Sequence, residues 1–340
     1  MLTRDKVLAT ILGAAVGDAL GMPVEGWSFQ RIKEKYERIT RLLPPKDHKY
    51  FSEKPAGWWT DDTSLTLAIL KSLTEVGGTN LENIMNHQLE EYEANKDGFG
   101  PKTNTALSIE RYKTKEKGWW CGNKEAKGNG IAMKSSPFGL YLEYISSTRS
   151  GEILDISQND LGKNILNISF VSHANNLSFA SGMVQAQAVK CCLENKVSIF
   201  DLMCNLVGMA LICESTEDHT LSNRLCDVRR FATWFRNGPP EDIFLTGEGF
   251  NFGKGGYYIP DSLPFTYMFF LRNPCSIESL FDLVSAGGDT DTNGSMCGAL
   301  LGATNGMKLF ERHEDLIEGL WRKDEIIDAV NAFCDKFEIK

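Results

Sequence analysis

Apolar residues recur at helical spacing along most of the chain. In the first segment they fall three or four positions apart, at Val7, Leu8, Ile11, Leu12, Ala15, Val16, Ala19 and Leu20. This spacing places them on one face of a helix. The same pattern predicts helices over residues 3–20, 62–73, 176–194, 197–213, 277–284, 293–310 and 323–337.

Strand signals are few, and strands do not alternate with helices in the way that builds a parallel sheet. We therefore predict an all-α fold in which residues 1–340 form one compact multi-helical domain. Within the helix predicted at 293–310, glycines recur every four residues, at Gly294, Gly298, Gly302 and Gly306. Because each costs about 1 kcal/mol relative to alanine, we expect a packing reason, namely the close approach of another helix.

The chain is acidic, with a formal net charge of -9. An acidic surface repels phosphates, so we expect no nucleic acid and no membrane as partner, and we expect a monomer. Nine cysteines, an odd number without a C-x-x-C motif, favour a reducing compartment, which we expect to be the cytoplasm. The apolar run at 7–20 resembles a signal peptide, but Asp18 and several glycines interrupt it, so we expect no cleavage.

Two short segments concentrate carboxylates and hydroxyls at predicted helix starts. The first is Thr60-Asp61-Asp62-Thr63, and the second is Asp289-Thr290-Asp291-Thr292, which follows two glycines. Such side chains often cap helices by accepting hydrogen bonds from free backbone N–H groups. One cap needs one side chain, however, and each segment supplies four.

Metal binding is the alternative to capping. Four carboxylates brought together cannot all stay ionised without countercharge, and two divalent cations would balance them. Carboxylate and hydroxyl oxygens suit Mg²⁺ or Mn²⁺, and neither segment carries a His or Cys that would favour Zn²⁺. The sequence therefore predicts that the two segments together hold two hard cations.

Six segments in order resemble the ADP-ribosylglycohydrolase family, also called the dinitrogenase-reductase-activating glycohydrolase-like family. They extend over most of the chain, at residues 13–25, 60–63, 128–134, 172–174, 256–264 and 287–292. Any one of them is a weak signal, whereas their order and the paired aspartate motifs are highly specific. The resemblance implies an all-α fold with a central binuclear Mg²⁺ or Mn²⁺ site.

The resemblance also implies roles for individual residues. The metal ligands would be Thr60, Asp61, Asp62, Asp289, Asp291 and Thr292. Glu25 would act with Asp62 and Asp291 in catalysis, as the acid–base residue at the scissile bond, either activating water or protonating the leaving group. The alternative for Glu25 is a solvated loop glutamate.

A further set of residues would bind the substrate. The loop at 123–130 offers backbone N–H groups that suit a diphosphate. The residues assigned to substrate binding are Lys127, Gly128, Asn129, Gly130, Met133, His173 and Tyr257. His173 would contact phosphate or ribose, with a core histidine at a helix start as the alternative. Tyr257 and Trp120 are candidates for stacking on adenine, with core or rim packing as the alternative.

The resemblance implies a metal-dependent hydrolase that cleaves the bond between ADP-ribose and a modified protein side chain, with arginine favoured. Its substrate would be an ADP-ribosylated protein and its product ADP-ribose. Arginine-specific members often carry an acidic residue near the position of Asp97. The alternatives are serine-linked ADP-ribose, O-acyl-ADP-ribose, or a non-catalytic binding or structural relative.

Overall fold

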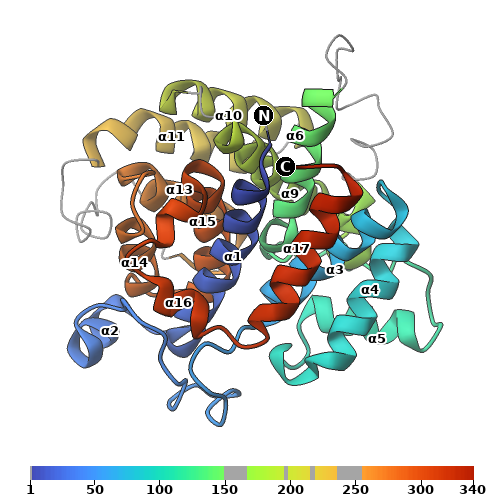
Figure 1. The fold of residues 1–340 in the computed structure, drawn as a ribbon, viewed down its shortest axis with the longest axis horizontal. Helices are drawn as coiled ribbons and strands as arrows, with labels where there is room; N and C mark the ends of the chain where they lie inside the picture. The colour runs from blue at the N-terminus through green and yellow to red at the C-terminus, as the bar shows by residue number, and fades with distance from the viewer. Residues whose placement is uncertain (1, 149–166, 195–197, 215–218, 236–254) are drawn as a thin grey trace.

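The computed structural model describes residues 2–148, 167–194, 198–214, 219–235 and 255–340. Helices dominate these residues, and apart from two isolated β-bridges no strand occurs among them. Figure 1 shows the helices gathered around α1 (Arg4–Gly21), drawn in blue. The predicted all-α architecture is confirmed.

Helices α1 and α15 (Thr290–Asn305) touch backbone to backbone. A Cβ added to Gly17 would lie 2.0 Å from the carbonyl oxygen of Gly294, and one added to Gly298 would lie 2.0 Å from that of Gly13. No side chain fits at such distances, so glycine is required at this crossing. The glycine stripe has the packing role that its spacing predicted, except that Gly306 instead ends α15 at a φ of 65°.

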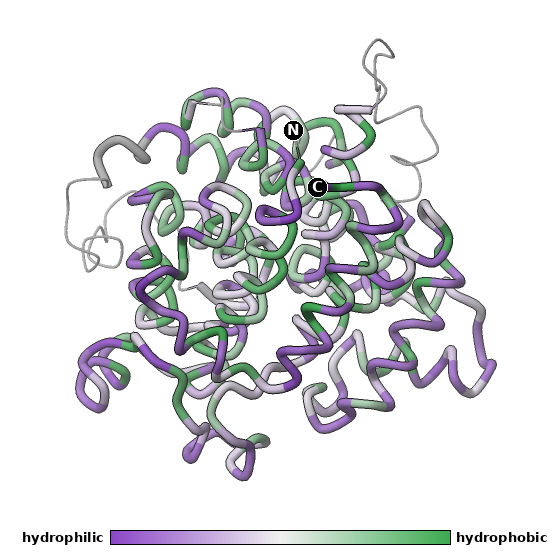
Figure 2. The backbone as a smooth tube through the Cα atoms, viewed as in Figure 1, coloured by the Kyte–Doolittle hydropathy of each residue, from purple (hydrophilic) through white to green (hydrophobic). Residues whose placement is uncertain are grey.

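Helix α1 is the central core helix of the described structure. The segment Arg4–Val24 is the one described helix that is long and apolar enough to cross a membrane by length and composition, and 94% of its apolar window is buried inside the protein. Figure 2 shows hydrophobic positions in green toward the interior and hydrophilic positions in purple on outlying helices such as α2 (Phe29–Tyr36). Burial within the protein accounts for the hydrophobicity of α1.

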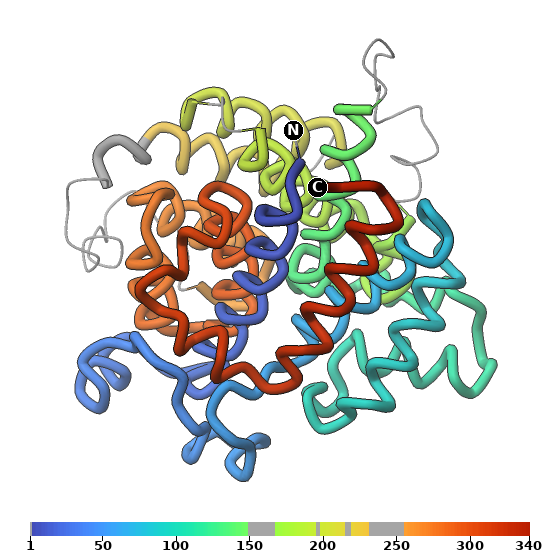
Figure 3. Tube along the Cα trace, in the orientation of Figure 1, coloured from blue at the N-terminus to red at the C-terminus, as the bar shows by residue number. Residues whose placement is uncertain are grey.

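Three helices pack in succession on one side of α1. These are α3 (Asp61–Val76), α4 (Leu81–Ala94) and α5 (Asn104–Lys113), and α17 (Lys323–Lys336) packs against both α1 and α3. The two ends of the chain lie side by side, as Figure 3 shows in blue and red. There the backbone N–H of Arg4 donates to the carbonyl of Lys340 at 2.9 Å.

The other helices cover α15 and the remaining flank of α1. Against α15 pack α9 (Asn176–Leu193), α13 (Ile259–Arg272) and α14 (Glu278–Ser285). Outside α9 lie α6 (Ser136–Thr148), α10 (Ile199–Cys213) and α11 (Thr220–Phe235). The short elements are η1 (Met22–Val24), η2 (Lys96–Gly98), η3 (Ala132–Lys134), α8 (Ser169–Ser172), η4 (Gly306–Phe310) and α16 (Glu314–Glu318).

All the helices predicted from apolar spacing are present, with shifted ends. The helix expected at 293–310 begins earlier, at Thr290, and continues beyond Asn305 as the 3-10 segment η4. The start expected at residue 197 lies outside the described residues. Several helices were not predicted from apolar spacing, among them α13. Pro264 inside α13 is normally a helix breaker, and tertiary packing overrides that preference.

Candidate metal centre and active site

The first acidic cluster opens helix α3. Thr60 is the N-cap, and its hydroxyl accepts a hydrogen bond from the backbone N–H of Asp62 at 3.4 Å. Capping is therefore real, but it uses only one of the four side chains. Asp61 and Asp62 occupy the first turn, where the positive end of the helix dipole favours carboxylates.

Asp18 of α1 holds this helix start in place. Its buried carboxylate accepts hydrogen bonds from the backbone N–H and hydroxyl of Thr60, each at 3.0 Å, and from those of Thr63 at 3.1 and 2.6 Å. Sequence reasoning assigned no role to Asp18. The available signal was a charged residue inside an otherwise apolar helix, which is rarely buried without a partner.

The second acidic cluster opens helix α15 in a different way. Asp289 precedes the helix, yet its side chain makes no capping hydrogen bond. Its backbone N–H donates to the carbonyl of Gly255, and its carboxylate accepts from Nδ2 of Asn129, both at 2.7 Å. The hydroxyl of Thr290 donates to the carbonyl of Gly21 at 2.8 Å and ties the cluster to the end of α1. Capping does not explain this cluster.

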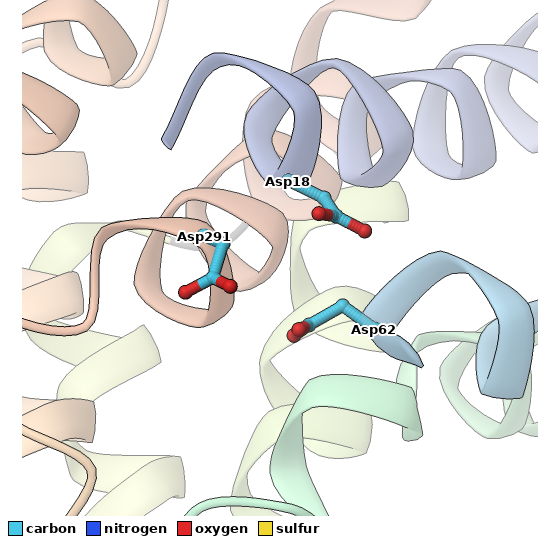
Figure 4. A group of neighbouring side chains, drawn as sticks. All are labelled: Asp18, Asp62 and Asp291. Carbon is cyan, nitrogen blue, oxygen red and sulfur yellow. The ribbon is translucent and has the colours of Figure 1, made fainter. Parts of the chain in front are cut away.

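The α1–α15 crossing brings the two clusters together. The hydroxyl of Thr292 donates to Oδ2 of Asp62 at 3.3 Å, which links α15 to α3. Figure 4 shows Asp18, Asp62 and Asp291 converging from three helices. Two groups of acidic side chains have oxygens within 4.8 Å of one another, namely Asp18, Asp62 and Asp291, and Glu25, Asp289 and Asp291.

Burial and mutual repulsion oppose the ionisation of these carboxylates. Burial raises the pKa of Asp61 to about 7, and repulsion by neighbouring carboxylates adds to the effect. The same causes, in the same order, raise the pKa of Asp289 to about 6. For Asp62 and Asp291 they raise the pKa well above its ordinary range. A cation among these groups would offset both effects.

The donor set fits hard divalent cations. Oδ1 of Asp62 is buried and has no hydrogen-bond partner, an arrangement that is costly unless a cation satisfies the oxygen. Both acidic groups offer only oxygen donors, and the hydroxyls of Thr60 and Thr292 stand beside them. Oxygen-only sites of this kind suit Mg²⁺, Mn²⁺ or Ca²⁺.

Glu25 reaches the second cluster because its loop is bonded to the glycine turn before Asp289. The backbone N–H of Gly26 donates to the carbonyl of Gly288 at 2.7 Å, and the N–H of Gly288 donates to the carbonyl of Trp27 at 3.0 Å. Gly26 has a φ of 75°, which favours glycine. The side chain of Glu25 is 37% exposed and faces the cavity described next, so it is not a freely solvated loop residue.

A cavity of about 340 Å³ opens above the acidic groups. All the residues proposed as metal ligands line it, together with Glu25. The substrate-binding residues that line it are Gly128, Asn129, Gly130, Met133, His173 and Tyr257. Lys127 is not among the lining residues; its side chain is exposed, and its carbonyl accepts from the backbone N–H of Ile259 at 3.2 Å.

Two loops form one wall of the cavity by pairing with each other. Gly128 and Tyr258 form an isolated β-bridge, and the backbone N–H of Asn129 donates to the carbonyl of Tyr257 at 2.9 Å. That N–H is therefore already occupied, which reduces the set of donors expected for a diphosphate. The ring of Tyr257 is 73% exposed at the rim, whereas Trp120 packs on Trp119 and does not line the cavity.

His173 lies deeper in the same wall. Its Nδ1 is 2.9 Å from the hydroxyl of Ser172, which accepts a hydrogen bond from the buried Lys134 at 3.3 Å. Burial, and then the charge of Lys134, lower the pKa of His173 to about 3, so the ring is neutral. A Cβ on Gly130 would lie 2.6 Å from Cε1 of His173, so this glycine lets the ring reach the cavity wall.

Two further segments line the cavity, and neither is among the substrate-binding residues predicted from the sequence. They are residues 50–51 and 100–105, which contribute Tyr50, Phe51, Gly100, Pro101, Thr103, Asn104 and Thr105. The second segment adjoins Asp97, near which arginine-specific members often carry an acid, whereas the first has no helical periodicity or charge cluster that would single it out. Only the folded chain brings these residues to the same cavity as the acidic groups.

An all-helical scaffold with a carboxylate-lined cavity at its centre defines the class of this protein. A family model for ADP-ribosylglycohydrolase matches residues 1–339. The chain belongs to the ADP-ribosylglycohydrolase family and is a hydrolase of glycosyl bonds.

Relatives and a solved structure agree with this assignment. An ADP-ribosyl-[dinitrogen reductase] glycohydrolase of Rhodospirillum rubrum is 25% identical and covers 89% of this chain and 87% of its own length. ADP-ribosylhydrolase ARH3 of Gallus gallus is also 25% identical, with coverage of 87% and 84%. An ADP-ribosylglycohydrolase-related protein complex superposes with a TM-score of 0.68 at 22% identity, covering 98% of each chain, which supports the fold.

Proposed function

We propose that the protein removes ADP-ribose from a modified protein side chain and that it requires two divalent cations, Mg²⁺ or Mn²⁺. The observation that carries this proposal is the convergence of Asp62 and Asp291 from separate helices, with Oδ1 of Asp62 buried and unpartnered. Loss of metal ligands would favour a non-catalytic relative, whereas all six proposed ligands are present and line the cavity.

The residues of the two clusters would hold the cations. They are Thr60, Asp61, Asp62, Asp289, Asp291 and Thr292, all of which line the cavity. When bound, the cations would supply Lewis acidity and a place for the ribose hydroxyls and a water molecule. Asn129 orients Asp289 through its 2.7 Å hydrogen bond.

Glu25 is the acid–base group of the proposed reaction. Cleavage at C1″ of the ribose develops oxocarbenium-like charge, so a carboxylate that moves a proton is required. Glu25 lies beside Asp289 and Asp291 with its side chain 37% exposed, and it can therefore exchange a proton with water or with the leaving group. The neutral ring of His173 and the rim ring of Tyr257 would contact the ADP-ribose portion.

The acceptor that we favour is arginine, because a cationic guanidinium suits a cavity lined by carboxylates. One observation supports an O-linked acceptor as the second candidate. Asp97, the acid expected near an arginine acceptor, lies in a neighbouring cavity and pairs with Lys54 at 2.9 Å; it does not line the cavity that holds Glu25. Serine-linked or O-acyl substrates need no such acid.

A direct assay separates these possibilities. The protein is incubated with Mg²⁺ or Mn²⁺ and with arginine-linked, serine-linked or O-acetyl ADP-ribose, and released ADP-ribose is measured. Release from one or more substrates, lost on chelation and strongly reduced but still measurable in the Glu25→Gln variant, is the expected result. No release from any of the three would refute the proposal. The nine free cysteines support assays under reducing conditions, in keeping with a cytoplasmic site of action.

A further inference from the structure

His48 is buried next to the acid–base residue of the proposed site. Its side chain is 6% exposed, and its Nε2 lies 3.0 Å from Oε2 of Glu25. His48 stands 23 residues after Glu25, in the connection between α2 and α3. It has no part in the metal clusters and does not line the cavity.

The hydrogen bonds of His48 determine which ring nitrogen carries the hydrogen. Nδ1 accepts from the backbone N–H of Tyr50 at 3.2 Å and from that of Phe51 at 3.1 Å. A nitrogen that accepts two N–H groups has no hydrogen of its own, so in the neutral ring the hydrogen is on Nε2. Nε2–H therefore donates to the carboxylate of Glu25.

Aromatic packing holds the ring in this orientation. The ring of His48 stacks on Phe51 with centroids 4.4 Å apart and planes 4° apart. Phe51 in turn meets Trp58 edge to face at 5.2 Å, and Trp58 is two residues before Thr60. The support for His48 is thus continuous with the chain that enters the first acidic cluster.

We propose that His48 is a positioning residue, which holds Oε2 of Glu25 through its Nε2–H and so sets the plane of that carboxylate toward Asp289 and Asp291. Because the two oxygens of a carboxylate share one rigid plane, a hydrogen bond to one oxygen also fixes the direction of the other. Glu25 is partly exposed and follows a 3-10 turn, so its own backbone does not restrict the side chain in this way. This inference rests on the proposed function, in which Glu25 moves the proton.

The kcat and KM values of three variants test whether His48 positions Glu25. His48→Phe keeps an aromatic ring on Phe51 but removes the donor, and kcat should fall by about 10- to 100-fold with little change in KM. His48→Gln offers an amide N–H near the position of Nε2–H and should stay within about threefold of wild type. The control is His87→Phe, on α4, where the ring pairs with Glu75 and Glu90 away from the cavity; its kcat should not change.

A double variant separates positioning from general support of the fold. If His48 acts through Glu25, adding His48→Phe to Glu25→Gln should change kcat by less than about threefold. Mn²⁺ affinity, measured by calorimetry, should be unchanged in His48→Phe, because the cation ligands are untouched. An additive loss of kcat, or a large loss of Mn²⁺ affinity, would overturn the proposal.

Nuclear magnetic resonance of ¹⁵N-histidine-labelled wild-type protein gives a readout that does not depend on activity. The His48 signals, assigned by their loss in His48→Gln, should show Nε2–H and an unprotonated Nδ1, and the Nε2 signal should shift in Glu25→Gln. Hydrogen on Nδ1 would refute the assignment. An inactive wild type with the expected spectrum would refute the proposed function alone, whereas an active wild type with unchanged kcat in His48→Phe would refute the positioning role alone.

Discussion

The two acidic clusters look alike in sequence, yet the structure holds them differently. In the first, the buried carboxylate of Asp18 accepts hydrogen bonds from both Thr60 and Thr63, and a side-chain cap completes the helix start. In the second, Asp289 has no side-chain cap and is held by the carbonyl of Gly255 and the amide of Asn129. A buried acid of the core helix anchors the first half, whereas loop residues hold Asp289 of the second half and only the hydroxyl of Thr290 bonds it to the end of α1.

The difference indicates that the two halves of the site are supported differently and so differ in rigidity. A helix start anchored by a buried acid on α1 is rigid, because moving it would leave the charge of Asp18 without its hydrogen bonds. The loop-held half carries Asn129 and the bridge between Gly128 and Tyr258, which are also the wall of the cavity. On the α15 side, Asn129 therefore both lines the cavity and holds the proposed metal ligand Asp289.

The largest effect should come from removing a carboxylate of either half. Asp62→Asn and Asp291→Asn should each lower kcat by at least about 100-fold, because each takes away a charge on which a shared cation site depends. Release of ADP-ribose and Mn²⁺ affinity are the measurements. Asp328→Asn, at an exposed position of α17, is the matched control and should keep full activity. Full activity in only one of the two cluster variants would show that the halves do not form one site.

The next largest effect is expected from replacing Asp18, whose carboxylate anchors the first acidic cluster. Asp18→Asn places amide hydrogens against N–H donors, so the start of α3 should loosen and the dissociation constant for Mn²⁺ should rise by roughly 10- to 100-fold. Calorimetric titration measures this change. Asp5→Asn alters an acid on the same helix far from the clusters and should leave affinity as it is. Equal affinities in the two variants would contradict the anchoring role of Asp18.

A smaller loss is expected on the loop-held side. Asn129→Ala removes a neutral donor to Asp289, so Mn²⁺ affinity should fall by about 10-fold, which is less than for Asp18→Asn. The control is Asn123→Ala. Asn123 lies in the same loop as Asn129, and the variant removes its exposed hydrogen bond to Asn104. If Asn129→Ala costs more affinity than Asp18→Asn, the comparison between a rigid and a loop-held half is wrong.

The smallest effect is on thermal stability. Burial raises the pKa of Asp18, Asp61 and Asp289 from the usual aspartate value of 3.8 to about 6 or 7. As pH rises through this range, the unfolded chain releases protons that the folded chain retains, so the cation-free protein loses stability. Bound cations offset the repulsion, so chelation should lower Tm by about 2–4 °C more at about pH 7.5 than at about pH 5. Scanning calorimetry measures Tm with and without chelator. An equal drop in Tm on chelation at both pH values would contradict this linkage.

Sequence patterns alone predicted the helical class and both aspartate clusters, because each depends on neighbouring residues. Helical spacing is local, and a cluster such as Asp289 to Thr292 is visible without its surroundings. The glycine stripe also predicted close helix contact correctly. The role of Asp18 could not be predicted, because its partners lie 42 and 45 residues away along the chain.

Tertiary structure alone decided which residues share the cavity. The cavity-lining residues at 50–51 have no local signature. Lys127, which the loop composition suggested as a phosphate contact, is directed to the surface. His48 reaches Glu25 only because the connection before α3 folds back over it. Charge and spacing are properties of a segment, whereas the distance between two side chains depends on how helices such as α1 and α15 cross.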